Sequence, residues 1–180
     1  MLKQDKKVIL EELWKASRSL RARDLCETLN FYFPSFMMHL LGLKRMGYVE
    51  CPEKGCYAIT RKGREVLGFP ELNQEFARGL LSPVPNEKAF YFFTGIGDYI
   101  GICANSLEDF CENIRIIDSR SFEFHMNRGD FENWFNGLGD TELARKISLL
   151  KTEDLNKEEL RKVIYQTVRN RCKEMKAILS

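Results

Sequence analysis

Residues 33–67 read FPSFMMHLLGLKRMGYVECPEKGCYAITRKGREVL and contain the change of pattern that decides the fold of the N-terminal part of the chain. Apolar side chains recur at helical spacing over residues 34–46, and Gly47 supplies a helix stop. Two short β-prone runs follow, at residues 48–51 and 56–60, and turn-forming residues separate them. The stretch therefore predicts a helix followed by a β-hairpin.

Helices are expected on both sides of this stretch. Thr60 is placed to cap a helix that begins at Arg61. Upstream, apolar residues at helical spacing predict helices over residues 6–16 and 22–29, with a turn at residues 17–20. Three helices, a hairpin and a closing helix within about 70 residues follow the order of a winged helix, which is built on a helix-turn-helix.

The hairpin region also carries a family resemblance. Residues 39–50, HLLGLKRMGYVE, resemble the end of the recognition helix and the entry to the wing in bacterial and archaeal regulators of the ArsR, MarR and PadR type. Residues 57–67, YAITRKGREVL, are similar to the wing exit of those families. The resemblance covers about the first 70 residues, and it implies a DNA-binding transcription regulator that is usually dimeric.

In a winged helix, the third helix enters the major groove and the wing contacts backbone phosphates. The residues expected to face DNA lie on the exposed side of the helix over residues 34–46, at the entry of the helix before it, and on the hairpin and closing helix. They are Arg18, Arg21, Arg23, Ser35, Met38, His39, Lys44, Arg45, Lys54, Arg61, Lys62 and Arg64.

The front of this third helix departs from what base recognition favours. Residues 33–38, FPSFMM, are nearly all apolar, whereas Arg, Lys, Asn and Gln make the paired hydrogen bonds that read base edges. Two hypotheses stay open. Either DNA is bound mainly through phosphate contacts and DNA shape, or the helix packs against another protein.

Cys51 and Cys56 flank the hairpin turn and are expected to face each other across it. Directly opposed strand residues have Cβ atoms about 4.5–5.5 Å apart, close to disulfide reach. The pair is either redox-sensitive or two unlinked thiols, and a cytosolic setting favours the second interpretation. No metal site is expected, because a single C-x4-C pair lacks the further ligands that a structural zinc needs.

Turn-forming residues at 68–70 and 81–86 mark a boundary. We therefore expect a winged-helix domain at residues 1–70, a linker with a short helix at residues 71–86, and a second domain at residues 87–180. The second domain is predicted to contain a β-hairpin packed with several helices and to end in a long amphipathic helix. The predicted fold class is α+β and helix-rich.

Three segments of the second domain resemble an uncharacterised domain family found mainly in archaea, sometimes beside a helix-turn-helix. They are residues 91–95 (YFFTG), 104–107 (ANSL) and 124–134 (FHMNRGDFENW). This resemblance implies that the domain shares the fold of that family. It does not indicate any catalytic or binding chemistry.

Aromatic residues of the second domain form either a ligand pocket or simply its core. The candidate pocket residues are Tyr91, Phe93, Tyr99, His125 and Trp134. The strand at residues 90–93 is apolar on both faces, so it is either central in a sheet or covered by a partner.

The proximity of His125 to Asp118, Asp130 and Glu132 also raises the hypothesis of a small hydrolase. The sequence contains no legible order of nucleophile, base and orienting group. Asp130 is better interpreted as the N-cap of a helix that begins at Phe131, with His125 as a hydrogen-bonded neighbour.

Charge is distributed unevenly along the chain, although the net charge is only +2. Residues 1–70 carry 13 basic and 8 acidic side chains, residues 71–154 carry 8 and 15, and residues 155–180 carry 7 and 3. A basic segment with a compact fold of its own is a candidate for phosphate contact.

A composition of 44% hydrophobic and 30% charged residues excludes a membrane protein and a disordered chain. No signal peptide or membrane span is legible, so a cytoplasmic location is expected. The leading hypothesis is a non-enzymatic regulator without a cofactor, which binds double-stranded DNA as a homodimer. Its second domain would sense an unidentified small-molecule or protein effector, or mediate oligomerisation. The alternative is an adaptor that uses the winged helix for protein contact.

Overall fold

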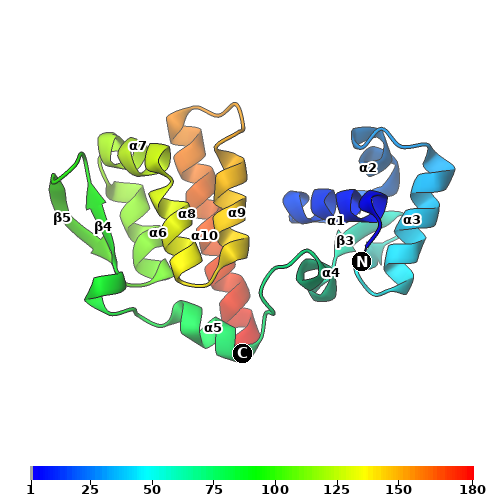
Figure 1. The fold of residues 1–180 in the computed structure, drawn as a ribbon, viewed down its shortest axis with the longest axis horizontal. Coiled ribbons are helices and arrows are strands. Elements are labelled where there is room, and N and C mark those ends of the chain that lie inside the picture. The colour runs from blue at the N-terminus through cyan, green and yellow to red at the C-terminus, as the bar shows by residue number, and fades with distance from the viewer. Residues whose placement is uncertain (1) are drawn as a thin grey trace. The chain divides into compact units, whose positions relative to one another are not determined.

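The computed structural model describes residues 2–180, and the chain divides into two compact units with the boundary after Glu71 (Figure 1). Over these residues the fold is α+β and helix-rich, with ten α-helices and two small antiparallel sheets. None of the described helices has the length and apolar composition needed to cross a lipid bilayer.

The first unit contains the helices and hairpin expected from its sequence, with ends shifted by a few residues. Its helices are α1 (Gln4–Ala16), α2 (Ala22–Thr28), α3 (Phe33–Arg45) and α4 (Arg61–Val66), and its strands are β1 (Leu20–Arg21), β2 (Val49–Glu53) and β3 (Cys56–Ile59). The strands form one sheet in the order β1–β3–β2. Apolar residues of α1, α2 and α3 meet this sheet in a single core.

Local signals set the ends of α3 and α4 as predicted. Gly47 follows α3 with a positive φ of 76°, and the Thr60 hydroxyl accepts a hydrogen bond of 3.1 Å from the Gly63 amide. At Gly63 the helix lies so close to the start of β2 that a Cβ atom would be 2.3 Å from the carbonyl oxygen of Tyr48. Glycine is therefore required where α4 packs on the hairpin.

Strand β1 is a correction to the turn expected at residues 17–20. Leu20 pairs with Tyr57 and Arg21 pairs with Cys56, so this short segment extends the hairpin into a three-stranded sheet. A strand of two residues has no periodicity of its own. It exists because β3 presents a free edge beside it.

The register of the hairpin also corrects the expectation that Cys51 and Cys56 face each other. Glu53 lies opposite Cys56, and the pairing shifts between Glu50 and Glu53. Only Lys54 and Gly55 separate the two strands, so the position across from Cys56 falls to Glu53 and not to Cys51. Both side chains are free thiols, and the Cys51 thiol donates a hydrogen bond of 3.0 Å to the carbonyl oxygen of Glu53.

The second unit surrounds a long C-terminal helix, which packs against α5, α6 and α9 (Figure 1). Its elements are α5 (Gln74–Leu81), a 3-10 turn (Asn86–Lys88), β4 (Phe90–Phe93), β5 (Tyr99–Ala104), α6 (Leu107–Ile116), α7 (Ser119–Arg128), α8 (Asp130–Gly137), α9 (Thr141–Leu150) and α10 (Lys157–Leu179). Helix α5 falls within the stretch interpreted as a linker, and its Ala77 and Leu80 belong to the core of this unit.

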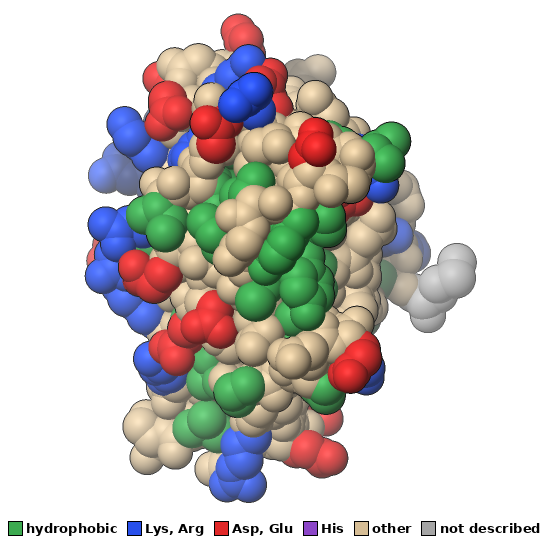
Figure 2. Space-filling view, turned by 90° about the vertical axis from the view of Figure 1, so that its left-hand side faces the viewer, with side chains coloured by type: hydrophobic (Ala, Val, Ile, Leu, Met, Phe, Trp, Pro, Cys, Tyr) green, Lys and Arg blue, Asp and Glu red, His purple; other side chains and the backbone are tan. Residues whose placement is uncertain are grey.

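The hairpin β4–β5 has one covered face and one open face. Phe90 and Phe92 point inward and are buried, whereas Tyr91 and Tyr99 lie on the outside with 37% and 46% of their surfaces exposed. In the described chain this sheet has two strands, so the first of the two alternatives, a central strand, is excluded and cover by a partner stays a prediction. Figure 2 looks onto this side of the molecule and shows hydrophobic side chains gathered in the middle of the view, with charged side chains around them.

A buried cluster of charges joins α9 to α10. The Arg171 guanidinium donates two hydrogen bonds to the Asp140 carboxylate, at 2.7 and 2.8 Å, and lies 3.0 Å from Glu142 and 2.8 Å from Glu174. Asp140 also accepts a 3.0 Å hydrogen bond from the Leu143 amide, which caps α9. The Asp140 carboxylate therefore caps α9 and also binds Arg171 of α10, which holds the two helices together.

Arg171→Met is expected to lower the free energy of unfolding of the second unit by about 3–5 kcal/mol, because it leaves buried carboxylates without their partner. Urea denaturation followed by the fluorescence of Trp134, with Trp14→Phe in both proteins, measures the change. Lys173→Met, at an exposed site on the same helix, is the control and should change stability by less than about 0.5 kcal/mol. A similar small effect of Arg171→Met would contradict the structural importance of the cluster.

Candidate functional site

Exposed basic side chains occur on several elements of the first unit. They come from the segment before α2 and its first turn, from the end of α3, from the β2–β3 turn and from the start of α4. The exposed members are Arg18, Arg21, Arg23, Lys44, Arg45, Lys54, Arg61 and Lys62. The pairing of Arg21 with Cys56 and a 2.9 Å hydrogen bond from the Ala22 amide to the Gly55 carbonyl bring Arg21 next to the hairpin turn.

The exposed face of α3 is apolar along its front and basic at its end. Phe33, Met38 and Leu41 expose 44%, 59% and 43% of their surfaces, and Tyr32, just before the helix, exposes 77%. Sequence reasoning placed Phe33 and Met38 in the apolar front of this helix and missed Tyr32 and Leu41. Ser35, also expected to face DNA, is half-buried.

Two predicted DNA contacts have other surroundings in the structure. The His39 side chain is only 13% exposed, and its Nε2 lies 3.4 Å from a carboxylate oxygen of Asp5 in α1. The expectation that His39 lies on the open side of α3 is therefore wrong, because the ring packs between helices and stands edge-on to Phe31. Arg64 is half-buried, unlike the exposed Arg61 beside it in α4.

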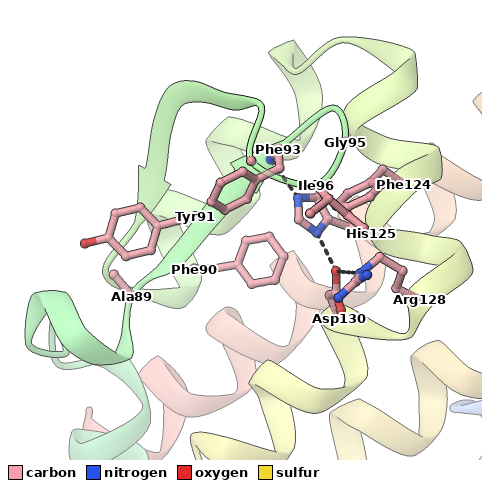
Figure 3. Close-up of a pocket in the computed structure, with 11 residues that line it drawn as sticks. Ala89, Phe90, Tyr91, Phe93, Gly95, Ile96, Phe124, His125, Arg128 and Asp130 are labelled. Atoms are coloured by element: carbon pink, nitrogen blue, oxygen red, sulfur yellow. Dashed lines mark hydrogen bonds and ion pairs between the residues drawn. The ribbon is translucent and has the colours of Figure 1, made fainter.

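The second unit contains a cavity of about 350 Å³ between the β4–β5 hairpin and the junction of α7 and α8 (Figure 3). Three of the five predicted pocket residues line it, namely Tyr91, Phe93 and His125. The other lining residues are Ala89, Phe90, Gly95, Ile96, Gly97, Phe124, Arg128 and Asp130.

Tyr99 and Trp134 stand outside this lining. Tyr99 packs on Tyr91 and Phe93 with ring centroids 5.7 and 5.5 Å away. The Trp134 ring stacks on Phe110, and its Nε1 donates a 2.8 Å hydrogen bond to the carbonyl oxygen of Lys88. Both rings therefore support neighbouring groups.

His125 connects the hairpin to the start of α8. Its Nε2 accepts a 2.8 Å hydrogen bond from the Phe93 amide, so the ring proton belongs on Nδ1, which donates to Asp130 at 2.8 Å. Asp130 accepts a second hydrogen bond of 3.1 Å from Nε of Arg128 (Figure 3). The prediction that the Asp130 side chain caps α8 is wrong, because Gly129 is the N-cap and the carboxylate serves His125 and Arg128 instead.

Burial lowers the pKa of His125 below its ordinary value, against the raising effects of the hydrogen bond and the charge of Asp130. A neutral ring with both nitrogens bonded to protein groups has no nitrogen left to take a proton from a substrate. The acidic residues named beside it in the sequence do not converge either, since Asp118 caps α7 and Glu132 pairs with Lys151. The His125 ring and its two hydrogen bonds therefore support the wall of a binding pocket.

Arg128 is the basic residue of the pocket lining, and sequence reasoning missed it. Its guanidinium lies 5.0 Å from the centroid of the Phe124 ring, one helical turn earlier in α7. The signal was present in the sequence, because Phe124 and Arg128 have the i, i+4 spacing of residues that share a helix face.

Among residues 2–180, no group of three or more His, Cys, Asp or Glu side chains is placed to hold a metal ion. The two units and the pocket define a helix-rich α+β protein with a small aromatic cavity that has charged groups at one side. Residues 74–169, slightly more than half of the chain, match the model of a family of unknown function, DUF5752, and the chain belongs to this family. No curated protein and no solved structure matches it.

The His125 ring is expected to titrate below about 6.5 in the folded protein, and Asp130→Asn should lower its pKa further by removing the carboxylate that favours the charged ring. Between the folded and unfolded pKa values the unfolded chain holds more protons, so this histidine makes stability fall as the pH drops below about 6.5. NMR titration of the imidazole resonances measures both values. A midpoint above 6.5, or a higher one in the variant, would contradict the assigned hydrogen bonds.

Proposed function

We propose that the protein is a winged-helix transcription regulator that binds double-stranded DNA through its first unit and acts as a homodimer in the cytoplasm. The observation that carries the proposal is α3, which leaves one long face exposed and is accompanied by the β2–β3 hairpin and by exposed basic side chains. The resemblance to the ArsR, MarR and PadR type regulators supports the assignment and the dimeric state.

The charges around α3 suit contact with two stretches of phosphate backbone. Arg21 lies beside the hairpin turn that carries Lys54. Arg61 and Lys62 lie at the other end of the hairpin, where Lys62 Nζ is 5.4 Å from the centroid of the Tyr48 ring. Phosphate contacts of this kind position a protein on the duplex without reading its sequence.

The apolar front of α3 shapes the expected specificity. Met38 and Leu41 lack the paired donors and acceptors that distinguish base edges, but such side chains can contact the methyl group of thymine in the major groove. We therefore expect strong dependence on salt and modest preference for sequence, with DNA shape as a further contribution.

A second candidate function is protein contact by the same face. The exposure of Tyr32, Phe33, Met38 and Leu41 favours this alternative, because contiguous exposed apolar residues often mark protein–protein interaction sites. The protein would then be an adaptor in which the winged helix binds a partner.

Binding to random-sequence and genomic duplexes across a salt series tests the first candidate. We expect affinity to fall steeply with salt, and Arg45→Ala with Lys54→Ala should reduce the slope of log affinity against log salt by about two, one for each lost phosphate contact. Fluorescence anisotropy of a labelled duplex measures the slope.

Lys15→Ala is the matched control, since this exposed lysine of α1 lies outside the proposed surface and pairs with Glu12. It should leave the slope unchanged. Absence of binding at low salt, or equal effects of the control and the double variant, would reject DNA binding. The apolar face of α3 would then be the place to look for a protein partner.

A further inference from the structure

Among the described residues that line the cavity of the second unit, Arg128 is the one with a permanent positive charge. His125 does not add to it, because burial favours the neutral ring and both of its nitrogens are bonded. Asp130 supplies one negative charge next to the guanidinium. The cavity thus combines aromatic walls with one balanced pair of charges.

The Arg128 guanidinium is held in a fixed orientation. Its Nε donates to Asp130, and its central carbon lies over the Phe124 ring, 5.0 Å from the centroid. Asp130 is in turn held by Nδ1 of His125, whose other nitrogen is bonded to the backbone of β4. Within the described chain the two terminal nitrogens, Nη1 and Nη2, have no protein partner, and the side chain remains 53% exposed.

We infer that this cavity binds a small organic monoanion, a carboxylate with an aromatic or similarly apolar body. The free Nη1 and Nη2 of Arg128 form a planar fork that matches the two oxygens of a carboxylate. The rings of Phe90, Tyr91, Phe93 and Phe124 provide the apolar wall for the rest of the molecule.

Size and charge limit the ligand further. A volume of about 350 Å³ is at the small end of the range for ligand sites, which suits a body of one or two rings. Asp130 repels any anion, and it repels a multiply charged phosphate more strongly than a singly charged carboxylate, so the site favours the monoanion.

The turn between β4 and β5 completes the wall. Ile96 is 89% exposed in a turn closed by a 3.1 Å hydrogen bond from the Asp98 amide to the Gly95 carbonyl, yet it lines the cavity. An isoleucine this exposed gains burial when an apolar body occupies the cavity beside it. The turn therefore contributes affinity that depends on the apolar part of the ligand.

Calorimetric titration of the full chain with 2-naphthoate, and with the neutral 2-naphthylmethanol, tests the inference. Wild-type protein should bind the carboxylate at least about tenfold more tightly than the alcohol, because only the carboxylate engages the guanidinium. Arg128→Gln should remove this preference, and Arg128→Lys should restore only part of it, since an ammonium lacks the planar fork.

Arg120→Gln is the control, because Arg120 is exposed on the same helix and outside the cavity lining. It should bind 2-naphthoate like the wild type. The inference is overturned if the wild-type chain does not bind the carboxylate, or if it binds carboxylate and alcohol equally. The same holds if Arg128→Gln retains the preference with a circular dichroism spectrum that shows it folded. These readouts do not involve DNA, so they are independent of the function proposed for the first unit.

Discussion

The buried pairing of Arg171 with Asp140 is the constraint on which the second unit depends. Charges cannot stay unpaired in an apolar interior, so α9 and α10 must meet with this arginine against this carboxylate. The same Asp140 carboxylate also caps α9 by accepting a hydrogen bond from the Leu143 amide. Because α10 also packs against α5 and α6, the position of one charged pair helps to fix the helices that carry the hairpin and the cavity.

The cavity depends on a second polar connection, which runs through His125. The ring ties the backbone of β4 to Asp130 at the start of α8, two segments more than thirty residues apart in the sequence. Its neutral state allows one nitrogen to accept and the other to donate. The outcome is a carboxylate placed to orient Arg128, so the histidine is a positioning residue rather than a group that handles protons.

The two units offer different chemistry. The first presents exposed cations around an apolar helix face, which suits phosphate contact more than base reading. The second presents a small, open aromatic pocket with one guanidinium at its side. A regulator that binds DNA with its first unit and a small organic acid with its second would use both surfaces. Each of the two binding activities can be tested separately.

The sequence by itself determined the local elements. Apolar spacing and the cap residue Thr60 placed the helices of the first unit, because these signals act within one turn of the chain. The tertiary structure alone decided strand β1, the offset between Cys51 and Cys56, the turning of His39 toward α1, and the joining of Asp130 with Arg128. Each of these depends on pairing or burial between separate elements, and spacing along the chain carries no information about which elements meet.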